Sequence, residues 1–496
     1  MKLEKVIPCL SQAKVTGPRE GEVGSLTDDS RRVERGGVFV AVRGTVVDGH
    51  DFVGKAVELG AGVIVAETPV QGGFEGTWIE VKDSRATLAV LADLFWGSPS
   101  QSLDVVGVTG TNGKTTVAYL VHGILKSLRM RAGMIGTVVV NDGAKEVRAS
   151  HTTPGAVELQ ALLARMRDNR CGGVAMEVSS HGLEQGRAAG VAFDVAVFTN
   201  LSQDHLDYHG SMENYFEAKK MLFEQLVTNG RRGVAVINGD DRWGQELVKS
   251  FEQRLKVLTY GFGVGADFRA GNIKQTMKGM EFPLEVKGKS HLVRVPLIGR
   301  FNVMNSLAAL SAVVALGIPV RDAVAALKDV GGVPGRLEYV GSSKGVSVFV
   351  DYAHTPDALQ NVGKTLRELE PKRLITVFGC GGDRDRGKRA PMARAAEAHS
   401  DFCVITSDNP RGEEPTAIIE QVAKGFTGQS FTKIEDRSKA IQTAVDFAES
   451  GDVVLIAGKG HEDYQLFGEQ RISFDDRVEA RKALDEKERS GEEARA

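Results

Sequence analysis

Hydrophobic residues in the middle of the chain form short apolar runs, and segments of helical period separate these runs. The runs lie at residues 104–108, 134–140, 173–178, 193–199 and 233–237, and each has the length of a buried strand. Strands that alternate with helices predict an α/β fold with a doubly wound parallel sheet. In such sheets ligands bind at the carboxyl ends of the strands.

A smaller block of the same kind precedes the middle of the chain. It contains apolar runs at 38–42 and 63–66 and a helical pattern at 85–96. The sequence Gly97-Ser98-Pro99-Ser100 then has the composition of a turn and linker. We therefore predict an N-terminal domain at residues 1–100.

A period of two appears between residues 266 and 297 and predicts a β-hairpin insertion, followed by a helix at 302–316. A further α/β block begins near residue 335. Its predicted strands lie at 346–350, 373–378, 402–406 and 452–456. We therefore predict a central domain at residues 101–334 and a C-terminal domain at residues 335–496.

Length and charge narrow the class of protein. A chain of 496 residues is too long for one core. With 62 basic and 65 acidic residues the formal net charge is −3, so no general basic field favours nucleic acid or a membrane surface. The longest apolar run, at 307–318, is short for a membrane span and predicts a buried helix. We expect a cytoplasmic monomer without nucleic-acid or membrane partners.

The run Gly110-Thr111-Asn112-Gly113-Lys114-Thr115-Thr116 follows an apolar strand and opens a helical pattern. Strand, glycine turn and helix N-terminus together form an anion cradle, because unpaired N–H groups and the helix dipole point at one place. Lys114 is placed to reach a β- or γ-phosphate and Thr115 to hold Mg²⁺. The usual spacing of phosphate loops requires a glycine at the position of Val108, so the general pattern is not met there.

Other strand ends carry polar side chains. Glu177 ends one strand and reads either as a metal ligand or as a solvated acid or helix cap. Residues 199–209 contain several groups able to bind metal, with His205 the main candidate. Lys219 and Lys220 lie on a predicted helix, where lysines are ordinarily solvated.

In the third block, Asp351 ends a strand and is suited either to ribose hydroxyls or to capping the next helix. Arg384 and Arg411, at later strand ends, suit carboxylate binding, and Glu462 suits an ammonium. Together they predict a site for a zwitterionic ligand such as an amino acid. Surface loops with ordinary salt bridges are the alternative.

Nine motifs occur along the chain, namely GTNGKTT, EVSSHG, TNLSQDHLDYH, GRFNVMNSLAA, PGRLE, DYAHTPDAL, GCGGDRDRGKR, SDNPR and AGKGHEDYQ. The whole chain resembles the Mur ligase family, because these motifs occur in the order seen in that family. The resemblance implies three domains. These are a small N-terminal α/β domain that binds UDP-MurNAc, a central ATPase-like domain with a parallel sheet, and a Rossmann-like C-terminal domain that binds an amino acid. The resemblance also explains why position 108 is a valine rather than a glycine, since the family's phosphate loop begins at Gly110.

The resemblance implies an ATP-dependent ligase of peptidoglycan precursor synthesis. Its substrates are ATP, UDP-MurNAc-L-Ala-D-Glu and meso-diaminopimelate, which is joined to the γ-carboxylate of D-Glu through an acyl phosphate. Folylpolyglutamate synthase, which shares the ATP-ligase core, is the nearest enzymatic alternative. A nucleotide-switched binding protein is an alternative of another class.

The resemblance also implies roles for individual residues. Those implied for ATP are Gly110, Thr111, Asn112, Gly113, Lys114, Thr115, Thr116, Asn302, Arg336 and Asp351. Two Mg²⁺ ions are implied at Thr115, Glu177, His205 and Lys219, the last as a carbamylated lysine. Catalytic roles fall to Lys114, Lys219, His205 and Arg336.

Two further sites follow from the resemblance. Ser30, Thr152, Thr153, Ser179, Gln185 and Arg187 would bind the UDP-MurNAc-peptide, with His151 where some relatives have asparagine. Arg384, Asp408, Asn409, Pro410, Arg411, Gly458 and Glu462 would bind diaminopimelate. Arg411 would select this amino acid, because lysine has no distal carboxylate to pair with it.

Overall fold

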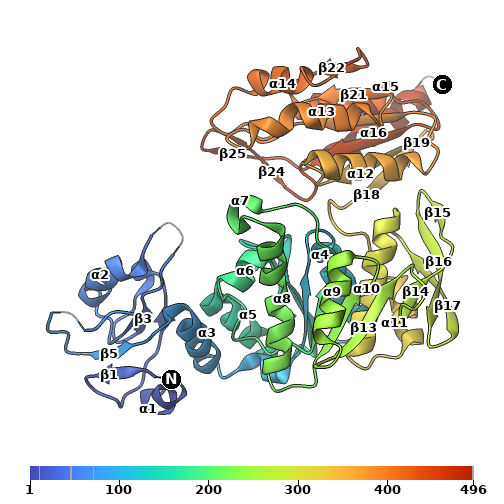
Figure 1. Cartoon of the computed structure of the whole chain (residues 1–496). Helices are drawn as coiled ribbons and strands as arrows, with labels where there is room; N and C mark the ends of the chain where they lie inside the picture. The colour runs from blue at the N-terminus through green and yellow to red at the C-terminus, as the bar shows by residue number, and fades with distance from the viewer. Residues whose placement is uncertain (11, 45–46, 71, 494–496) are drawn as a thin grey trace. The chain divides into compact units, whose positions relative to one another are not determined.

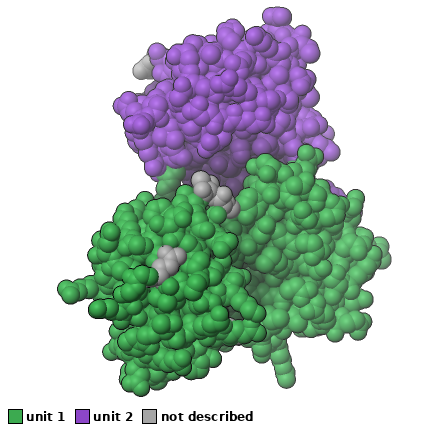
Figure 2. All heavy atoms as spheres, turned by 60° about the vertical axis from the view of Figure 1, so that its left-hand side comes forward, with its two compact units in different colours: residues 1–269, 285–289, 304–327 green, residues 270–284, 290–303, 328–496 purple. Residues whose placement is uncertain are grey.

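The computed structural model describes residues 1–10, 12–44, 47–70 and 72–493. The chain divides into two compact units, coloured separately in Figure 2. The first unit comprises residues 1–269, 285–289 and 304–327, and the second unit comprises residues 270–284, 290–303 and 328–496.

The N-terminal part of the first unit is built on a five-stranded sheet. In sheet order its strands are β1 (Lys14–Thr16), β5 (Thr77–Glu80), β4 (Val63–Ala66), β3 (Val38–Val40) and β2 (Leu26–Thr27). Only β1 runs antiparallel to its neighbour. Alternate side chains of β3 enter two separate clusters, one with α3 (Ser84–Phe95) and one with α2 (Val53–Glu58). The predicted strands and helix of this block are confirmed.

A second sheet carries parallel strands predicted for the middle of the chain (Figure 1). The predicted strands are β6 (Asp104–Thr109), β10 (Gly173–Glu177), β11 (Val195–Phe198) and β12 (Val234–Asn238). A further parallel strand, β13 (Lys256–Gly261), pairs with β12 and was not predicted. They lie in the order β13-β12-β11-β6-β10. Because the chain leaves β6 and returns on either side of it, the sheet is doubly wound and the carboxyl end of β6 faces a topological switch point.

Helices cover both faces of this sheet. Side chains of α5 (Ala156–Asp168), α8 (Met212–Thr228) and α9 (Arg242–Phe251) join one buried cluster with β10 and β11. On α4 (Lys114–Ser127), which contacts α11 (Val320–Leu327), Val117, Leu120 and Val121 are fully buried. Burial on both faces explains why these strands read as continuous apolar runs.

The single strand predicted at 134–140 is wrong. The chain forms β7 (Ala132–Ile135), turns, and pairs antiparallel with β8 (Val139–Asn141), which pairs in turn with β9 (Glu146–Arg148). Gly136 lies in the turn, where a Cβ atom would collide with Oε1 of Glu177. The interruption therefore lets the backbone pass close to this carboxylate.

The predicted hairpin insertion is confirmed. It contains β14 (Phe268–Ala270), β15 (Lys274–Thr276), β16 (Gly279–Val286) and β17 (Lys289–Val295), and β15 pairs antiparallel with β16. The helix predicted after it is α10 (Arg300–Ala315), in which Leu307 and Leu310 are fully buried. Among the described residues no helix has the length and apolarity needed to cross a membrane.

The C-terminal part of the second unit is built on a six-stranded sheet. In sheet order the strands are β18 (Glu338–Ser343), β19 (Val346–Asp351), β23 (Val453–Ala457), β20 (Leu374–Phe378), β21 (Phe402–Ile405) and β22 (Phe431–Lys433). All neighbours are parallel except β18 and β19. The four buried central strands were predicted from their apolar runs, whereas the edge strands β18 and β22, which are less apolar, were not predicted.

The helices of this part also lie on both faces of their sheet (Figure 1). One cluster includes side chains of α12 (Pro356–Arg367), α13 (Arg389–Glu397) and α14 (Pro415–Ala423), and the other includes α15 (Arg437–Phe447) and α16 (Asp476–Glu493). The two-stranded sheet of β24 (Tyr464–Phe467) and β25 (Gln470–Ser473) was also missed. The short elements are α1 (Leu3–Val6), η1 (Ile7–Cys9), η2 (Ser30–Arg32), η3 (Gly49–Phe52), η4 (Pro99–Ser102), α6 (Ser180–Glu184), α7 (Leu206–His209) and η5 (Arg386–Lys388).

Candidate active site

The glycine loop joins β6 to α4 in the first unit. Its two glycines have positive φ, +143° at Gly110 and +89° at Gly113, and Gly113 is the N-cap of α4. A Cβ atom at Gly113 would also collide with the side chain of Asn305. The Nζ atom of Lys114 donates to the carbonyl oxygens of Gly110, at 3.0 Å, and Thr111, at 2.8 Å. The carbonyl groups of the loop thus hold the ammonium group of Lys114 at the N-terminus of α4.

Residues Thr199 and Asn200, after β11, hold this loop in place. Thr199 Oγ1 donates to the carbonyl of Asn112 at 2.6 Å, and Asn200 Oδ1 accepts from the N–H of Asn112 at 3.0 Å. Part of the polar segment at 199–209 therefore supports the loop rather than facing a metal.

Glu177 and Thr115 meet at the carboxyl end of the sheet. Thr115 Oγ1 donates to Glu177 Oε2 at 2.9 Å, and Glu177 also accepts from the N–H of Thr137 at 2.8 Å. The carboxylate is fully buried, which rules out a solvated acid, and the cap of α6 is Ser179. A buried carboxylate beside a hydroxyl at the phosphate loop fits Mg²⁺, which prefers oxygen ligands.

Within the described part of the chain, no group of three or more His, Cys, Asp and Glu side chains is arranged to hold a metal ion. Mg²⁺ commonly uses one or two carboxylates and takes its other ligands from substrate phosphates and water.

Lys219 is 1% exposed on α8, and its Nζ atom donates to the carbonyl of Gly110 at 2.8 Å. The ring of Tyr215 lies 4.3 Å from the same nitrogen. Burial and the charge of Lys114 hold the pKa of Lys219 well below its usual value of 10.5. The expectation of a solvated lysine is therefore wrong for this residue. A lowered pKa favours the neutral form of the amine, which is the form that reacts with CO₂ to give a carbamate.

His205 is half exposed and begins α7 with a φ of +51°. Its ring lies 6.1 Å from that of Tyr215 and 4.9 Å from that of His181, and Nε2 lies 3.5 Å from Asp204 Oδ2. His205 and Lys219 thus share a neighbour, Tyr215, at the same end of the sheet.

Five of the six residues predicted for the UDP-MurNAc-peptide, all except Ser30, are linked to Glu177 by hydrogen bonds. Thr153 Oγ1 donates to the carbonyl of Glu177 at 3.1 Å, and the N–H of Ser179 donates to Thr153 Oγ1 at 3.0 Å. Arg187 donates to Thr153 O at 3.0 Å and to Gln185 Oε1 at 2.6 Å. Thr152 Oγ1 lies 3.0 Å from Thr137 Oγ1.

A cavity of about 340 Å³ opens beside this set. Its lining includes Asp28, Arg85, His151, Gln185 and Arg187, so two predicted residues and the variant His151 share one hollow. Burial raises the pKa of Asp28, and Arg85 Nη1 donates to the carbonyl of Gln185 at 3.4 Å. Ser30, two residues after Asp28, is the first residue of η2 and is buried. Arg85 and Asp28 were missed, since a helical arginine and a loop aspartate have no sequence pattern of their own.

Three residues predicted for ATP belong to the second unit. Asp351 accepts from the N–H groups of Leu337, at 2.6 Å, and Ala353, at 2.7 Å, and burial raises its pKa to about 6. Thr355 is the N-cap of α12, so a capping role for Asp351 is wrong. The guanidinium of Arg336 lies 4.8 Å from the ring centre of Tyr352.

Asn302, the third of these residues, is buried on α10 and donates to the carbonyl of Ile298 at 2.8 Å. Its contact with ATP stays a prediction.

The loops predicted for diaminopimelate meet at the carboxyl ends of β20, β21 and β23. A Cβ atom at Gly381 would lie 3.0 Å from Arg411 Nη1 and 3.8 Å from Arg384 Cγ, so the two arginines flank one glycine. Arg411 has a φ of +52°, and its Nη1 donates to the carbonyl of Gly382 at 3.0 Å. The backbone of Arg411 is held by Leu466 of β24, whose carbonyl accepts from its N–H at 2.9 Å.

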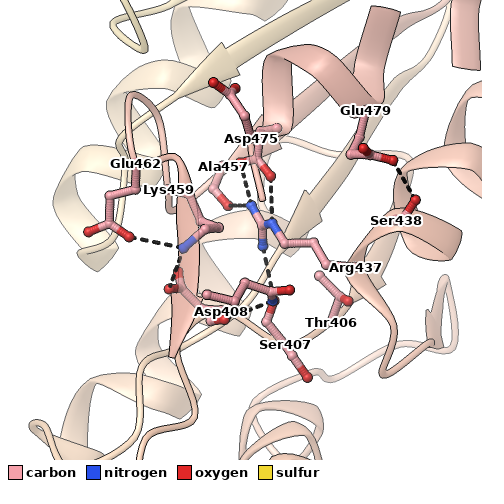
Figure 3. A network of polar contacts seen from close by, with 12 residues as sticks. Thr406, Ser407, Asp408, Arg437, Ser438, Ala457, Lys459, Glu462, Asp475 and Glu479 are labelled. Atoms are coloured by element: carbon pink, nitrogen blue, oxygen red, sulfur yellow. Dashed lines mark hydrogen bonds and ion pairs between the residues drawn. The ribbon is translucent and has the colours of Figure 1, made fainter. Parts of the chain in front are cut away.

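A buried polar network lies behind these loops (Figure 3). Asn409 Nδ2 and Lys459 Nζ each donate to Glu462 Oε2 at 2.9 Å. At Gly458, where φ is +118°, a Cβ atom would lie 2.7 Å from Asp408 Oδ2. Lys459 stands within the motif AGKGHEDYQ, but its complete burial cannot be read from the sequence.

Known proteins resemble this chain over almost its whole length. Three family models match it: Mur ligase family, catalytic domain, at residues 22–96; Mur ligase middle domain at 108–313; and Mur ligase, glutamate ligase domain at 335–460. The UDP-N-acetylmuramoyl-L-alanyl-D-glutamate–2,6-diaminopimelate ligase of Geobacter sulfurreducens is 44% identical over 500 residues, covering 97% of this chain and 98% of the relative.

Solved structures of related enzymes also resemble this chain. One of a UDP-N-acetylmuramoyl-L-alanyl-D-glutamate–2,6-diaminopimelate ligase is 36% identical, with a TM-score of 0.73, covering 98% of this chain and 99% of the other. Folylpolyglutamate synthase of Mycobacterium tuberculosis has a TM-score of 0.62 at 21% identity, covering 76% of this chain and 93% of the other, and resembles it in fold alone. The full-length match to relatives at this identity, together with all three family models, shows that the chain belongs to the Mur ligase family.

Proposed function

We propose that the protein adds meso-diaminopimelate to the D-Glu γ-carboxylate of UDP-MurNAc-L-Ala-D-Glu, giving the UDP-MurNAc-tripeptide, ADP and phosphate. The similarity to diaminopimelate ligases over 97% of the chain supports these substrates. The observation that carries the ligase chemistry is Lys219, buried against the phosphate loop. A P-loop switch has no need of a buried lysine that donates to the phosphate loop.

The reaction proceeds in two displacements. The γ-carboxylate of the peptide attacks the γ-phosphorus of ATP, and ADP leaves, which gives an acyl phosphate. The amine of diaminopimelate then attacks the acyl carbon, and the tetrahedral intermediate loses phosphate and a proton to leave the amide. Exclusion of water protects the acyl phosphate from hydrolysis.

We assign ATP binding to the loop at 110–116 and to Asn302, Arg336 and Asp351. Lys114 and Arg336 would stabilise the negative charge that shifts from the γ-phosphoryl group to ADP. Thr115 and Glu177 would hold one Mg²⁺, and His205 and carbamylated Lys219 a second. When bound, Mg²⁺ neutralises phosphate charge as a Lewis acid.

We assign the UDP-MurNAc-peptide to Ser30, Thr152, Thr153, Ser179, Gln185 and Arg187. Two observations support this assignment. The cavity beside Gln185 and Arg187 holds cationic side chains suited to a diphosphate or carboxylate. Hydrogen bonds from Thr153 to Glu177 link these residues to the phosphate loop, where the peptide carboxylate must meet ATP.

We assign diaminopimelate to the loops that carry Arg384, Asp408, Asn409, Pro410, Arg411, Gly458 and Glu462. The two arginines beside Gly381 suit the distal carboxylate, and Glu462 suits an ammonium. Lysine, which lacks that carboxylate, would leave the guanidinium of Arg411 without an anionic partner.

Ligation with ATP, the UDP-MurNAc-dipeptide and either diaminopimelate or lysine, measured by product mass, tests the function. We expect the diaminopimelate product, and we expect Arg411→Ala to reduce the preference over lysine by about tenfold or more, the worth of one charged hydrogen-bonded contact. Exposed Arg471→Ala, in the same unit, serves as the control. A lysine product alone, or full selectivity in Arg411→Ala, would overturn the respective assignment.

The proposed substrates place the reaction in the cytoplasm, where ATP is available. We also propose that the protein works as a monomer, which sedimentation at assay concentration would test.

A further inference from the structure

Lys459 is a buried cation whose contacts lie within the proposed amino-acid site. It follows β23 and is 0% exposed, yet the assignments above give it no role. A lysine in such a place loses its hydration, so the fold must stabilise its charge by neighbouring groups.

Its neighbours are three polar side chains of that site. The Nζ atom lies 2.9 Å from Glu462 Oε2, 3.2 Å from Asn409 Oδ1 and 3.9 Å from Asp408 Oδ1. Asn409 Nδ2 in turn donates to Glu462 Oε2 at 2.9 Å. Lys459, Asn409 and Glu462 therefore form a closed triangle of hydrogen bonds, of which Figure 3 shows the bond between Lys459 and Glu462.

The orientation of Glu462 follows from this triangle. Both hydrogen bonds from Lys459 and Asn409 end on the same oxygen, Oε2. Oε1 is thereby directed away from the two donors. It is the oxygen that a ligand ammonium would meet.

The net charge of the side chains around Lys459 also suits a ligand ammonium. One ammonium and two carboxylates, those of Asp408 and Glu462, give the group a net charge of −1. The ammonium of Lys459 offsets one of these two negative charges and leaves the other for a cationic ligand.

The backbone around Lys459 is held by a second buried ion pair. Arg437, 1% exposed, makes two 2.7 Å bonds to Asp476. It also donates to the carbonyls of Ala457 and Ser407, at 2.9 and 3.3 Å, and so joins the strand before Lys459 to the loop before Asn409 (Figure 3). The backbone on either side of this network is thus held in place by Arg437.

We propose that Lys459 is a positioning residue, which fixes Asn409 and Glu462 so that Glu462 Oε1 receives an ammonium of the amino-acid substrate. The inference rests on the proposed function, since it concerns the site assigned to diaminopimelate. Lys459 touches the side chains that would bind the substrate and acts through them.

Steady-state kinetics of Lys459→Met provide the test, because methionine keeps the volume and removes the charge. We expect KM for diaminopimelate to rise about tenfold or more, the effect of losing one charge-assisted contact. KM for ATP and for the UDP-MurNAc-dipeptide should change less than about twofold. Lys439→Met, at an exposed site in the same unit, is the matched control and should change none of these constants.

A double-mutant cycle with Glu462→Gln separates positioning from general support of the fold. If Lys459 acts through Glu462, adding Lys459→Met to Glu462→Gln raises KM for diaminopimelate less than about twofold further. Additive effects, or an equal rise in all three KM values, would overturn the inference. Lys459→Gln, which keeps a donor without charge, replaces Lys459→Met if that variant does not fold, and should raise the same KM by a smaller factor.

The remaining outcomes are also decisive. If neither variant folds, Lys459 has a structural role and the inference is wrong. If the wild type ligates diaminopimelate and the variants keep its KM, the inference fails while the proposed function stands. If the wild type does not ligate diaminopimelate, the proposed function fails first and the inference falls with it.

Discussion

At the scale of single residues, burial decides what a side chain can do. Lys219 and Lys220 are neighbours on α8, but Lys219 is buried against Gly110 and Lys220 pairs with Glu217 near the surface. Burial holds the pKa of Lys219 well below its usual value. The same reasoning applies to Asp351, whose pKa burial raises to about 6.

The first prediction concerns carbamylation of Lys219. With ¹³C-bicarbonate, we expect a carbamate carbon signal in the wild type, because the neutral amine is the reacting form. The signal should fade as the pH is lowered through the depressed pKa of Lys219, since protonation removes the nucleophile. Lys219→Gln should lose the signal and reduce kcat about a hundredfold or more, because it removes a proposed metal ligand. A signal that persists in Lys219→Gln and disappears in the control Lys220→Gln would contradict this.

A second prediction concerns the pH dependence of stability. A folded-state pKa of about 6, against 3.8 in the unfolded chain, means that the folded state binds the Asp351 proton more tightly. The resulting stability is complete below pH 3.8 and is lost as the pH rises through 6. Between pH 4.5 and 7.5 the free energy of unfolding, measured in urea, should shift in favour of Asp351→Asn by about 2 kcal/mol. A pH-independent difference between the two proteins would refute this.

At the scale of elements, glycines with positive φ place the phosphate loop. Gly110 and Gly113 take conformations that other residues adopt at a cost, and Gly113 also faces Asn305 without room for a Cβ atom. Gly136 similarly lets the turn after β7 pass Glu177. These positions explain why a strand end, a helix start and a carboxylate approach one another so closely.

The third prediction is that Gly113→Ala raises KM for ATP about tenfold or more. The substitution combines backbone strain of about 1–3 kcal/mol with a collision against Asn305, so the loop must shift. Gly230→Ala is the matched control, because Gly230 has a φ of +74° and no atom within 4 Å of a Cβ. It should be destabilised and keep the KM of the wild type. Equal KM values for both variants would exclude a special role of Gly113.

At the scale of the whole molecule, each unit gathers chemistry at the carboxyl ends of parallel strands. The first unit holds the phosphate loop, Glu177 and Lys219, and the second holds the arginine loops and the Lys459 network. Under the proposed function, these parts of the two units serve one reaction.

The corresponding prediction concerns the dependence of phosphate release on substrates. Steady release from ATP should require both the UDP-MurNAc-dipeptide and diaminopimelate, because without the amine the acyl phosphate has no acceptor. A coupled phosphate assay with each substrate omitted in turn measures this. Full release with ATP alone would favour a nucleotide switch, and release driven by a folate and glutamate would favour a folylpolyglutamate synthase.

Sequence by itself determined the fold class, the alternation of strands and helices, and the strand ends that carry polar groups. These follow from local periodicity and from motifs such as GTNGKTT, which need no knowledge of distant contacts. The turn at Gly136 and the strands β18, β22, β24 and β25 were not predicted from the sequence, because close approach and edge pairing depend on partners far along the chain.

Only the tertiary structure decided which polar residues are buried and which touch one another. It shows that Lys219 is buried and Lys220 is not, and that Thr355 rather than Asp351 caps α12. It also shows that Lys459 is fully buried beside Glu462. The physical reason is that hydration and pairing set the charge and pKa of a side chain, and both depend on neighbours that folding brings together.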